Sequence, residues 1–168
     1  MALILGIDPG SVKTGFGIIN ASPVGISGRH HYVVSGVIRL PDADLAERLQ
    51  IIFASICDLI EEYCPQQMAI EQVFMSKNAG SALKLGQARG AAMVAATSNR
   101  LPVAEYEARK VKQSVVGHGA ADKYQVQQMI KSLLKLTATP QEDAADALAV
   151  ALCHANTCLL YTSDAADD

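Results

Sequence analysis

The chain has 168 residues, of which half are hydrophobic and 18% are charged, so its composition excludes a disordered protein and supports one domain with a substantial core. The formal net charge of -3 by itself disfavours a nucleic-acid ligand. The charge is unevenly distributed, however. Residues 72–135 carry 10 basic and 3 acidic side chains, whereas residues 1–71 carry 4 and 8, and residues 136–168 carry 0 and 6. This basic middle segment keeps a polyanion among the candidate ligands.

The sequence predicts a cytosolic protein without a membrane span. No apolar run reaches the roughly 18–20 residues that cross a bilayer. The first residues, Met1 to Asp8, lack the basic region of a signal peptide. The cysteines include no Cys-x-x-Cys pair, so we expect free thiols rather than disulfides or zinc ligands. They are Cys57, Cys64, Cys153 and Cys158.

The first part of the chain predicts three strands with short links, a pattern that favours an antiparallel meander. The first strand, Leu3 to Asp8, is apolar up to its last residue and precedes the turn residues Pro9-Gly10. The next two strands span 14–20 and 31–40. Asp44 is then the expected N-cap of a helix that Pro65 closes.

The second part of the chain alternates short strands with helices. The expected strands span 68–73 and 101–106, and the expected helices span 79–98, 108–116 and 123–134. Asn78 can cap the first of these helices. Thr139 and Glu142 are expected to form a capping box at the start of the last helix, which is predicted to end near Asn156.

Together these elements predict one α/β domain over residues 1–157, with a mixed five-stranded sheet flanked by helices. Residues 158–168 show no periodicity and end in acidic side chains. We interpret them as a short tail, disordered or non-native, outside the domain.

Four carboxylates occupy positions where the flanking residues are apolar. Asp8 ends the first strand, Glu71 interrupts the fourth, and Asp143 and Asp146 lie three residues apart on one face of the last helix. Buried carboxylates without partners become protonated or destabilise the fold. Residues 136–168 contain no Lys or Arg that could pair with the two helical acids. A divalent cation is the simplest neutraliser, and oxygen ligands favour Mg²⁺ or Mn²⁺ over zinc.

Each acid also has a purely structural interpretation. Asp8 before Pro-Gly can form a turn, Glu71 can pair with a basic side chain across the sheet, and Asp143 can stabilise the helix N-terminus. If two cations bind instead, one activates a water for attack on phosphorus and the other stabilises the leaving 3′ oxygen. The basic middle segment would then offset the phosphate charge of a polyanionic substrate.

Several segments in series resemble the RuvC family of bacterial Holliday-junction endonucleases, over about residues 2–155. They are GIDPGS from Gly6, Thr14-Gly15, AIEQVF from Ala69, SALKLGQARG from Ser81, Val111-Lys112-Gln113 through Val116-Gly117, and DAADA from Asp143. The resemblance implies an RNase H-like fold and a homodimeric, Mg²⁺-dependent endonuclease. Such an enzyme holds two Mg²⁺ per active site, with Mn²⁺ as a substitute, and cuts two opposed strands of a four-way junction. It acts in DNA recombination and repair in the bacterial cytoplasm, beside the RuvA–RuvB branch-migration complex.

The family's pattern also assigns roles to residues of this chain. The catalytic and metal-binding acids fall on Asp8, Glu71, Asp143 and Asp146, the junction-facing aromatic on Phe74, and the basic residues near the scissile phosphate on Lys112 and Lys123. Further candidates for DNA binding are Lys77, Lys84, Arg89 and Lys110. An exposed Phe74 can stack on an unpaired base, or it can fold into the core. Lys112 and Lys123 can also be merely solvated, and the Gly- and Ala-rich helix over 79–98 is either a dimer surface or an ordinary core helix.

Three other functions stay open on the sequence. An RNase H-like enzyme can act on RNA–DNA hybrids or structured RNA instead of junctions. An ATPase of the actin–hexokinase type shares an Asp-x-Gly motif, here Asp8-Pro9-Gly10, but needs two lobes, for which 168 residues are too few. A catalytically silent junction-binding module would not need all four acids.

Overall fold

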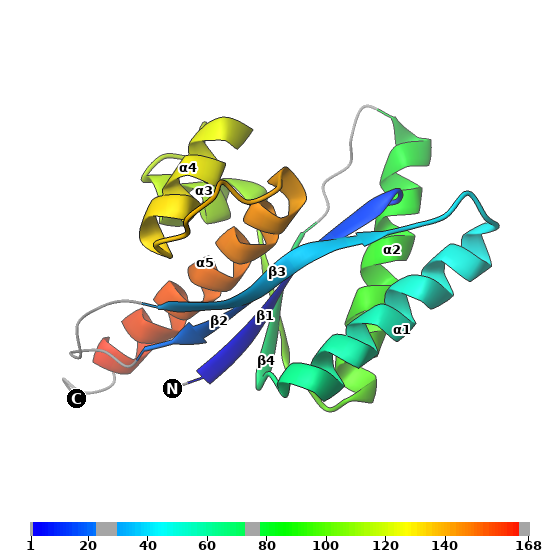
Figure 1. Ribbon diagram of the computed structural model, residues 1–168, viewed down its shortest axis with the longest axis horizontal. Helices are drawn as coiled ribbons and strands as arrows, with labels where there is room; N and C mark the ends of the chain where they lie inside the picture. Colours follow the sequence, from blue (N-terminus) through cyan, green and yellow to red (C-terminus); the bar gives the residue numbers. More distant parts are fainter. Residues whose placement is uncertain (1, 23–29, 73–77, 165–168) are drawn as a thin grey trace.

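Five strands form one mixed sheet in the order β3-β2-β1-β4-β5. Figure 1 shows the labelled strands β1 to β4 of this sheet between the helices of its two faces. The strands β1 (Ala2–Asp8), β2 (Lys13–Ala21) and β3 (His31–Arg39) make the predicted antiparallel meander. On the other side of β1, the strands β4 (Gln67–Glu71) and β5 (Val103–Tyr106) add in parallel. The predicted α/β class with a mixed five-stranded sheet is therefore confirmed.

The computed structural model describes residues 2–22, 30–72 and 78–164, with side chains as far as residue 158. Two of the predicted DNA-binding residues, Phe74 and Lys77, lie outside these ranges. Among the described residues, no helix is both long and apolar enough to cross a membrane. No disulfide forms between the cysteines, all four of which lie in the described part of the chain.

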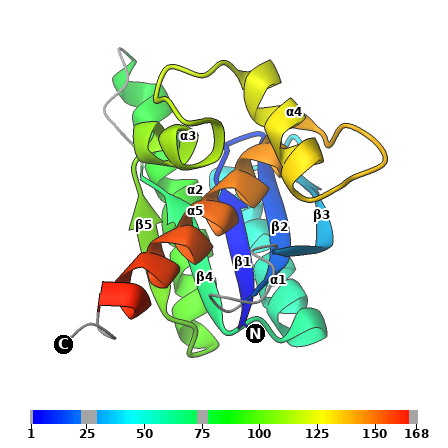
Figure 2. The ribbon, with the colours of Figure 1, turned by 90° about the vertical axis from the view of Figure 1, so that its left-hand side faces the viewer.

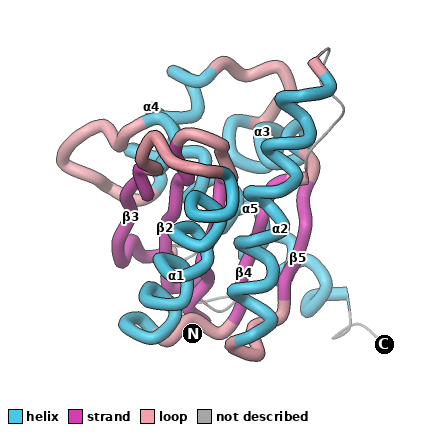
Figure 3. Tube along the Cα trace, turned by 90° about the vertical axis from the view of Figure 1, so that its right-hand side faces the viewer, coloured by secondary structure: helices cyan, strands magenta, loops and turns pink. Residues whose placement is uncertain are grey.

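Helices cover both faces of the sheet. The helices α1 (Leu45–Tyr63) and α2 (Ala79–Ser98) lie on one face (Figure 3). The other face carries α5 (Glu142–Asp164), with α3 (Ala108–Val116) and α4 (Lys123–Leu133) packed on its outer side (Figure 2). The sheet is therefore the middle layer of three, buried on both faces.

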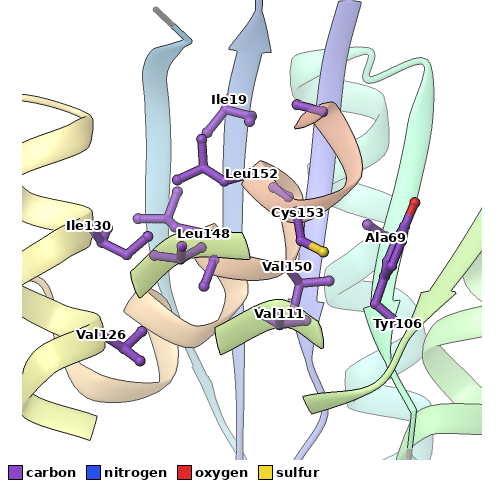
Figure 4. Close-up of a cluster of buried hydrophobic side chains, with 14 of the residues drawn as sticks. Ile19, Ala69, Tyr106, Val111, Val126, Ile130, Leu148, Val150, Leu152 and Cys153 are labelled. Atoms are coloured by element: carbon purple, nitrogen blue, oxygen red, sulfur yellow. The ribbon is translucent and has the colours of Figure 1, made fainter. Parts of the chain in front are cut away.

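Side-chain alternation along β1 supplies both hydrophobic cores. Leu5 and Ile7 point toward α1 and α2, whereas Ile4 belongs to the core beneath α5. Figure 4 shows this second core, where Leu148 and Val150 of α5 lie between the sheet and the helices α3 and α4. Leu5, Ile7 and Leu148 are fully buried. The two cores hold β1 and α5 in fixed positions, and each of these elements carries predicted site residues.

Three glycines let α5 approach the sheet closely. A Cβ atom on Gly6 would lie 2.0 Å from the carbonyl oxygen of Ala147, and one on Gly15 would lie 2.0 Å from that of Asp143. On Gly17 it would lie 2.6 Å from the side chain of Leu148. Side chains at these positions would push the helix outward, so the glycines set how near α5 comes to β1 and β2.

The predicted helix N-termini have mixed outcomes. Asn78 caps α2, because its side-chain oxygen accepts hydrogen bonds from the backbone N–H groups of Gly80 at 3.0 Å and Ser81 at 3.3 Å. Asp44 stands at the N-cap position of α1 as predicted, but its side chain makes no capping hydrogen bond.

The capping box predicted from Thr139 and Glu142 is wrong. The helix α5 begins at Glu142, and the side-chain oxygen of Gln141 accepts hydrogen bonds from the N–H groups of Asp143 at 2.7 Å and Ala144 at 3.1 Å. Glu142 instead forms an ion pair with Lys123 of α4. The helix also continues to Asp164, past the predicted end near Asn156.

The close contact between β2 and α5 predicts that Gly15→Ala destabilises the protein. The new methyl group would overlap a backbone oxygen, which cannot rotate away, so we expect a loss of about 3 kcal/mol in the free energy of unfolding. Urea unfolding monitored by circular dichroism measures it.

Gly36→Ala on β3 is the matched control. Its Cβ would lie 2.8 Å from the end of the half-buried Phe16 ring, a side chain that can shift. We expect this variant to lose less than about 1 kcal/mol. Equal losses in the two variants would contradict the role assigned to Gly15.

Candidate active site

The four predicted acids line one cavity of about 290 Å³. Asp8 and Glu71 end β1 and β4, which are parallel neighbours, so their carboxyl ends meet at the same edge of the sheet. Asp143 and Asp146 project from the first turns of α5, which the glycines of β1 and β2 hold against this edge. Residues from the two ends of the chain thus meet in one site.

Two of the predicted basic residues share this cavity. Lys112 comes from α3 and is half-buried, and Lys123 comes from the start of α4 with a side chain that is 72% exposed. The rest of the wall is apolar and consists of Ala108, Val111, Val115, Val126, Ala149 and Val150. The site therefore has acids toward the sheet, lysines from the two helices and a hydrophobic lining that strengthens electrostatic interactions.

Burial and mutual repulsion raise the pKa of Asp8 and Asp146. Burial is the main cause that raises the pKa of Asp8 to about 8, and the charges of Asp146 and Glu71 add to it. Burial and the charge of Glu71 raise the pKa of Asp146 to about 7. Burial also raises the pKa of Glu71, although the hydrogen bond with Asp8 and the charge of Lys112 oppose the shift. We therefore assign the proton of this hydrogen bond to Asp8 and the acceptor role to Glu71.

Asp143 has a different set of partners. Lys13 Nζ at the start of β2 lies 3.2 Å from Asp143 Oδ2, and the side-chain amide of Gln141 donates to the same oxygen at 2.8 Å. Sequence reasoning missed both residues because it sought a cation only near Asp143 in the chain. The available signal was the position of Lys13, which closes the turn that begins at Asp8.

Arg89, on α2, contacts the backbone of the site at the end of β4. Its Nε donates to the backbone carbonyl of Glu71 at 3.2 Å, and its guanidinium forms an ion pair with Glu105 of β5. It therefore holds the end of β4, which carries Glu71. The sequence left open that Glu71 pairs with a basic side chain for structural reasons. Arg89 contacts Glu71 in this way only at its backbone oxygen and not at its carboxylate.

Two further basic candidates within the described ranges, Lys84 and Lys110, do not line the acidic cavity. The Lys110 ammonium lies 5.2 Å from the centre of the Tyr106 ring. Lys84 lines a separate pocket of about 230 Å³ with Ser11 and Arg48. Contact of Lys84, Arg89 and Lys110 with DNA stays a prediction, as it does for Phe74 and Lys77 outside the described ranges.

The donor set suits hard divalent cations. Four carboxylates supply only oxygen ligands, and the raised pKa values of Asp8, Glu71 and Asp146 mark a negative charge that the protein alone does not offset fully. In the part of the chain that is described, no three Asp, Glu, His or Cys side chains converge closely enough to hold a metal in their present positions. In this arrangement, three of the four acids have partners within the protein: Asp8 and Glu71 share a hydrogen bond, and Asp143 forms an ion pair with Lys13.

Comparison with known proteins agrees with this geometry. The family model "Crossover junction endodeoxyribonuclease RuvC" matches residues 4–154. The protein of that name from Saccharophagus degradans is 68% identical over 158 residues, which cover 94% of this chain and 89% of the relative.

Solved structures show the same fold. Thermus thermophilus RuvC in complex with a Holliday junction substrate has a TM-score of 0.87 and 32% identity, and the match covers 96% of this chain and 98% of that one. The yeast mitochondrial Holliday junction resolvase, at 12% identity and a TM-score of 0.66, shares the fold alone, over 94% of this chain and 80% of that one. The five-stranded sheet with helices on both faces is the RNase H-like fold that the family resemblance implied. With the family model and close relatives covering almost the whole length, the chain belongs to the RuvC family of crossover junction endodeoxyribonucleases.

Proposed function

We propose that the chain is a divalent-metal-dependent endonuclease that resolves four-way DNA junctions by cutting two opposed strands during recombination and repair. The observation that carries this proposal is the cavity in which four carboxylates and two lysines meet. Membership of a junction endonuclease family, and a solved relative that is bound to a Holliday junction, support the choice of substrate. The resemblance to the family is the basis for also proposing a role in the bacterial cytoplasm beside a RuvA–RuvB complex.

Asp8, Glu71, Asp143 and Asp146 are the proposed metal ligands and catalytic acids. Two Mg²⁺ ions per site, or Mn²⁺ in their place, would relieve the repulsion that raises the pKa of Asp8 and Asp146. Bound cations would supply an activated water for in-line attack on phosphorus and charge stabilisation for the leaving 3′ oxygen. The chain's own task is to hold the four carboxylates in place and to restrict water through the apolar wall.

Lys112 and Lys123 are the proposed phosphate-binding residues of the cavity. Both line the cavity that holds the acids and come from α3 and α4, the helices packed on the outer side of α5, which suits contact with the phosphates of a DNA strand at the cavity. The proposal also keeps Phe74 as the aromatic that stacks on an unpaired base. Additional backbone contacts are proposed for Lys77, Lys84, Arg89 and Lys110.

The outer face of α2 is the proposed homodimer surface. Leu83 and Val94 are 67% and 54% exposed on this helix. A Cβ atom on Gly86 or Gly90 would meet nothing within 4 Å, so both glycines face outward beside them. An exposed apolar stripe with small residues permits close packing of two helices, and two-fold symmetry would present two identical sites to two opposed strands.

The alternative functions have less support. The solved junction complex of a family member favours a junction over an RNA–DNA hybrid. The four acids in one cavity favour an enzyme over a silent binding module. The match over residues 4–154 favours a nuclease over an ATPase of the actin–hexokinase type.

Cleavage of a synthetic mobile four-way junction tests the proposal. We expect Mg²⁺-dependent, paired cuts on opposed strands when the products are mapped on both strands. The Asp8→Asn and Glu71→Gln variants should lose cleavage by at least about a hundredfold because they lose a metal ligand. Junction binding by gel shift should persist, because it depends on the basic side chains.

The matched control is Asp58→Asn, which removes an exposed acid from α1 on the opposite face of the sheet. It should cleave like the unmodified protein. Preference for an RNA–DNA hybrid over the junction would refute the proposed substrate. Loss of binding in step with cleavage would refute the division between metal ligands and DNA-binding residues.

The raised pKa values predict that the metal-free protein loses stability as pH increases. Folded Asp8 and Asp146, with pKa values of about 8 and about 7, bind protons more tightly than in the unfolded chain. Between about pH 4 and their folded pKa values, the folded state thus holds more protons, so the free energy of unfolding should fall by up to about 1.4 kcal/mol per pH unit for each group.

Urea unfolding in EDTA from pH 5.5 to 8.5 measures this slope. Asp146→Asn should flatten the slope, and Asp58→Asn should leave it unchanged. Stability that is constant or increases over this range would contradict the electrostatic description of the cavity.

The dimer proposal predicts that Leu83→Asp or Val94→Asp yields monomers. A charge in the middle of an apolar helix contact is costly to bury, so we expect the dimerisation constant to weaken by at least about a hundredfold. Sedimentation velocity measures the change. Leu133→Asp on α4, where Leu133 is 44% exposed, is the control that should stay dimeric. If the Leu83 and Val94 variants dimerise as tightly as the unmodified protein, the interface lies elsewhere.

A further inference from the structure

Among the described residues, Lys13 is the one basic residue that forms an ion pair with one of the four acids Asp8, Glu71, Asp143 and Asp146. The family pattern assigned Lys13 no role. Its Nζ lies 3.2 Å from Asp143 Oδ2, with the two side chains 41% and 21% exposed. The same oxygen accepts the amide of Gln141 at 2.8 Å. By contrast, Lys123 forms its ion pair with Glu142, outside the four acids.

The backbone determines where Lys13 points. The register pairs Gly15 with Asp8 of β1 and with Val37 of β3, so β2 is held on both sides at Gly15, and it pairs Lys13 with Arg39 of β3. Lys13 and Gly15 lie two residues apart and therefore share one face of the strand. At Gly15 this face touches the carbonyl of Asp143, with no room for a Cβ atom. Lys13 consequently extends toward the start of α5.

The turn before Lys13 is also well ordered by local contacts. The fully buried Thr14 donates its hydroxyl to the carbonyl of Gly10 at 3.3 Å. A Cβ atom on Gly10 would lie 2.0 Å from the carbonyl oxygen of Lys13, so the turn is as tight as glycine allows. The turn that follows Asp8 thus places Lys13 beside Asp143, a second acid of the same site.

An ammonium ion paired with a carboxylate disfavours a divalent cation on the same group, because the two positive charges repel each other. We propose that Lys13 is a positioning residue that holds Asp143 in the metal-free protein and competes with the divalent cation for its carboxylate. This inference rests on the proposed metal-dependent function. A lysine suits the role, because its compact charge sits on a flexible stem that can turn toward solvent when the carboxylate is engaged elsewhere.

The competition gives the sign and size of the expected effect. Removing one positive charge beside a carboxylate ligand should tighten binding of a divalent cation. A partly exposed ion pair is worth up to about 1 kcal/mol, so the dissociation constant should fall by roughly three- to fivefold. A lysine that served only the fold would give the opposite result, since its loss would loosen Asp143 and weaken the site.

Mn²⁺ binding to the DNA-free protein tests the proposal, with free Mn²⁺ followed by electron paramagnetic resonance. Lys13→Met and Lys13→Gln should both bind Mn²⁺ about three- to fivefold more tightly than the unmodified protein. Lys13→Arg keeps the charge and should stay near the unmodified affinity. Lys135→Met, which removes an exposed lysine beside His31 at the other end of β3, should change nothing.

The outcomes separate this inference from the proposed function. Equal or weaker Mn²⁺ binding by both Lys13→Met and Lys13→Gln would overturn the role of Lys13 even if junction cleavage is normal. Equal tightening by Lys135→Met would also overturn it, because the effect would then be one of net charge. If the unmodified protein binds no Mn²⁺ and cleaves junctions in EDTA, the metal-dependent function itself fails, and the inference fails with it.

Discussion

The structure depends on the contact between the glycines of β1 and β2 and the alanine-rich start of α5. Gly6 and Gly15 bring the sheet backbone against the carbonyl oxygens of Ala147 and Asp143 with no side chain between them. Asp8 and Asp143 are far apart in the sequence, and this contact brings them into one cavity. The hydrophobic cores on the two faces fix the layers, but the glycines fix how near the helical acids come to the strand acids.

This close approach has an electrostatic consequence. Four carboxylates in a partly apolar cavity repel one another, which together with burial raises the pKa of Asp8, and cations from three other elements lie near the acids or their backbone. Lys13 and Lys112 act from β2 and α3, and Arg89 holds the backbone of Glu71 from α2. A site that is costly for folding is common where function needs clustered charge. The elements around the cavity therefore do two jobs, since each packs against the core and each offsets or positions an acid.

Local patterns predicted what depends on local physics. Alternation and length identified the strands and helices, and acids between apolar neighbours identified Asp8, Glu71, Asp143 and Asp146 as a group that the structure brings together. The capping box failed because Glu142 pairs with Lys123, which lies far from it in the sequence, and Gln141 caps α5 instead. The contacts of Lys13 with Asp143 and of Arg89 with Glu71 and Glu105 were not predicted, for the same reason. Their partners are set by strand register and helix packing, which no short sequence window contains.

The charge distribution gains a sharper meaning from these contacts. The basic middle segment is not simply a surface for a polyanion, because Arg89 is paired with Glu105 and Lys110 lies over Tyr106. Around the cavity, three lysines face five carboxylates, namely Lys13, Lys112 and Lys123 against Asp8, Glu71, Glu142, Asp143 and Asp146. Fully ionised, this group has an excess of two negative charges, which repels a phosphate. Two divalent cations would turn the excess into two positive charges, which attracts one. The sign of the field at the site therefore depends on metal loading, and the net charge of -3 for the chain does not report it.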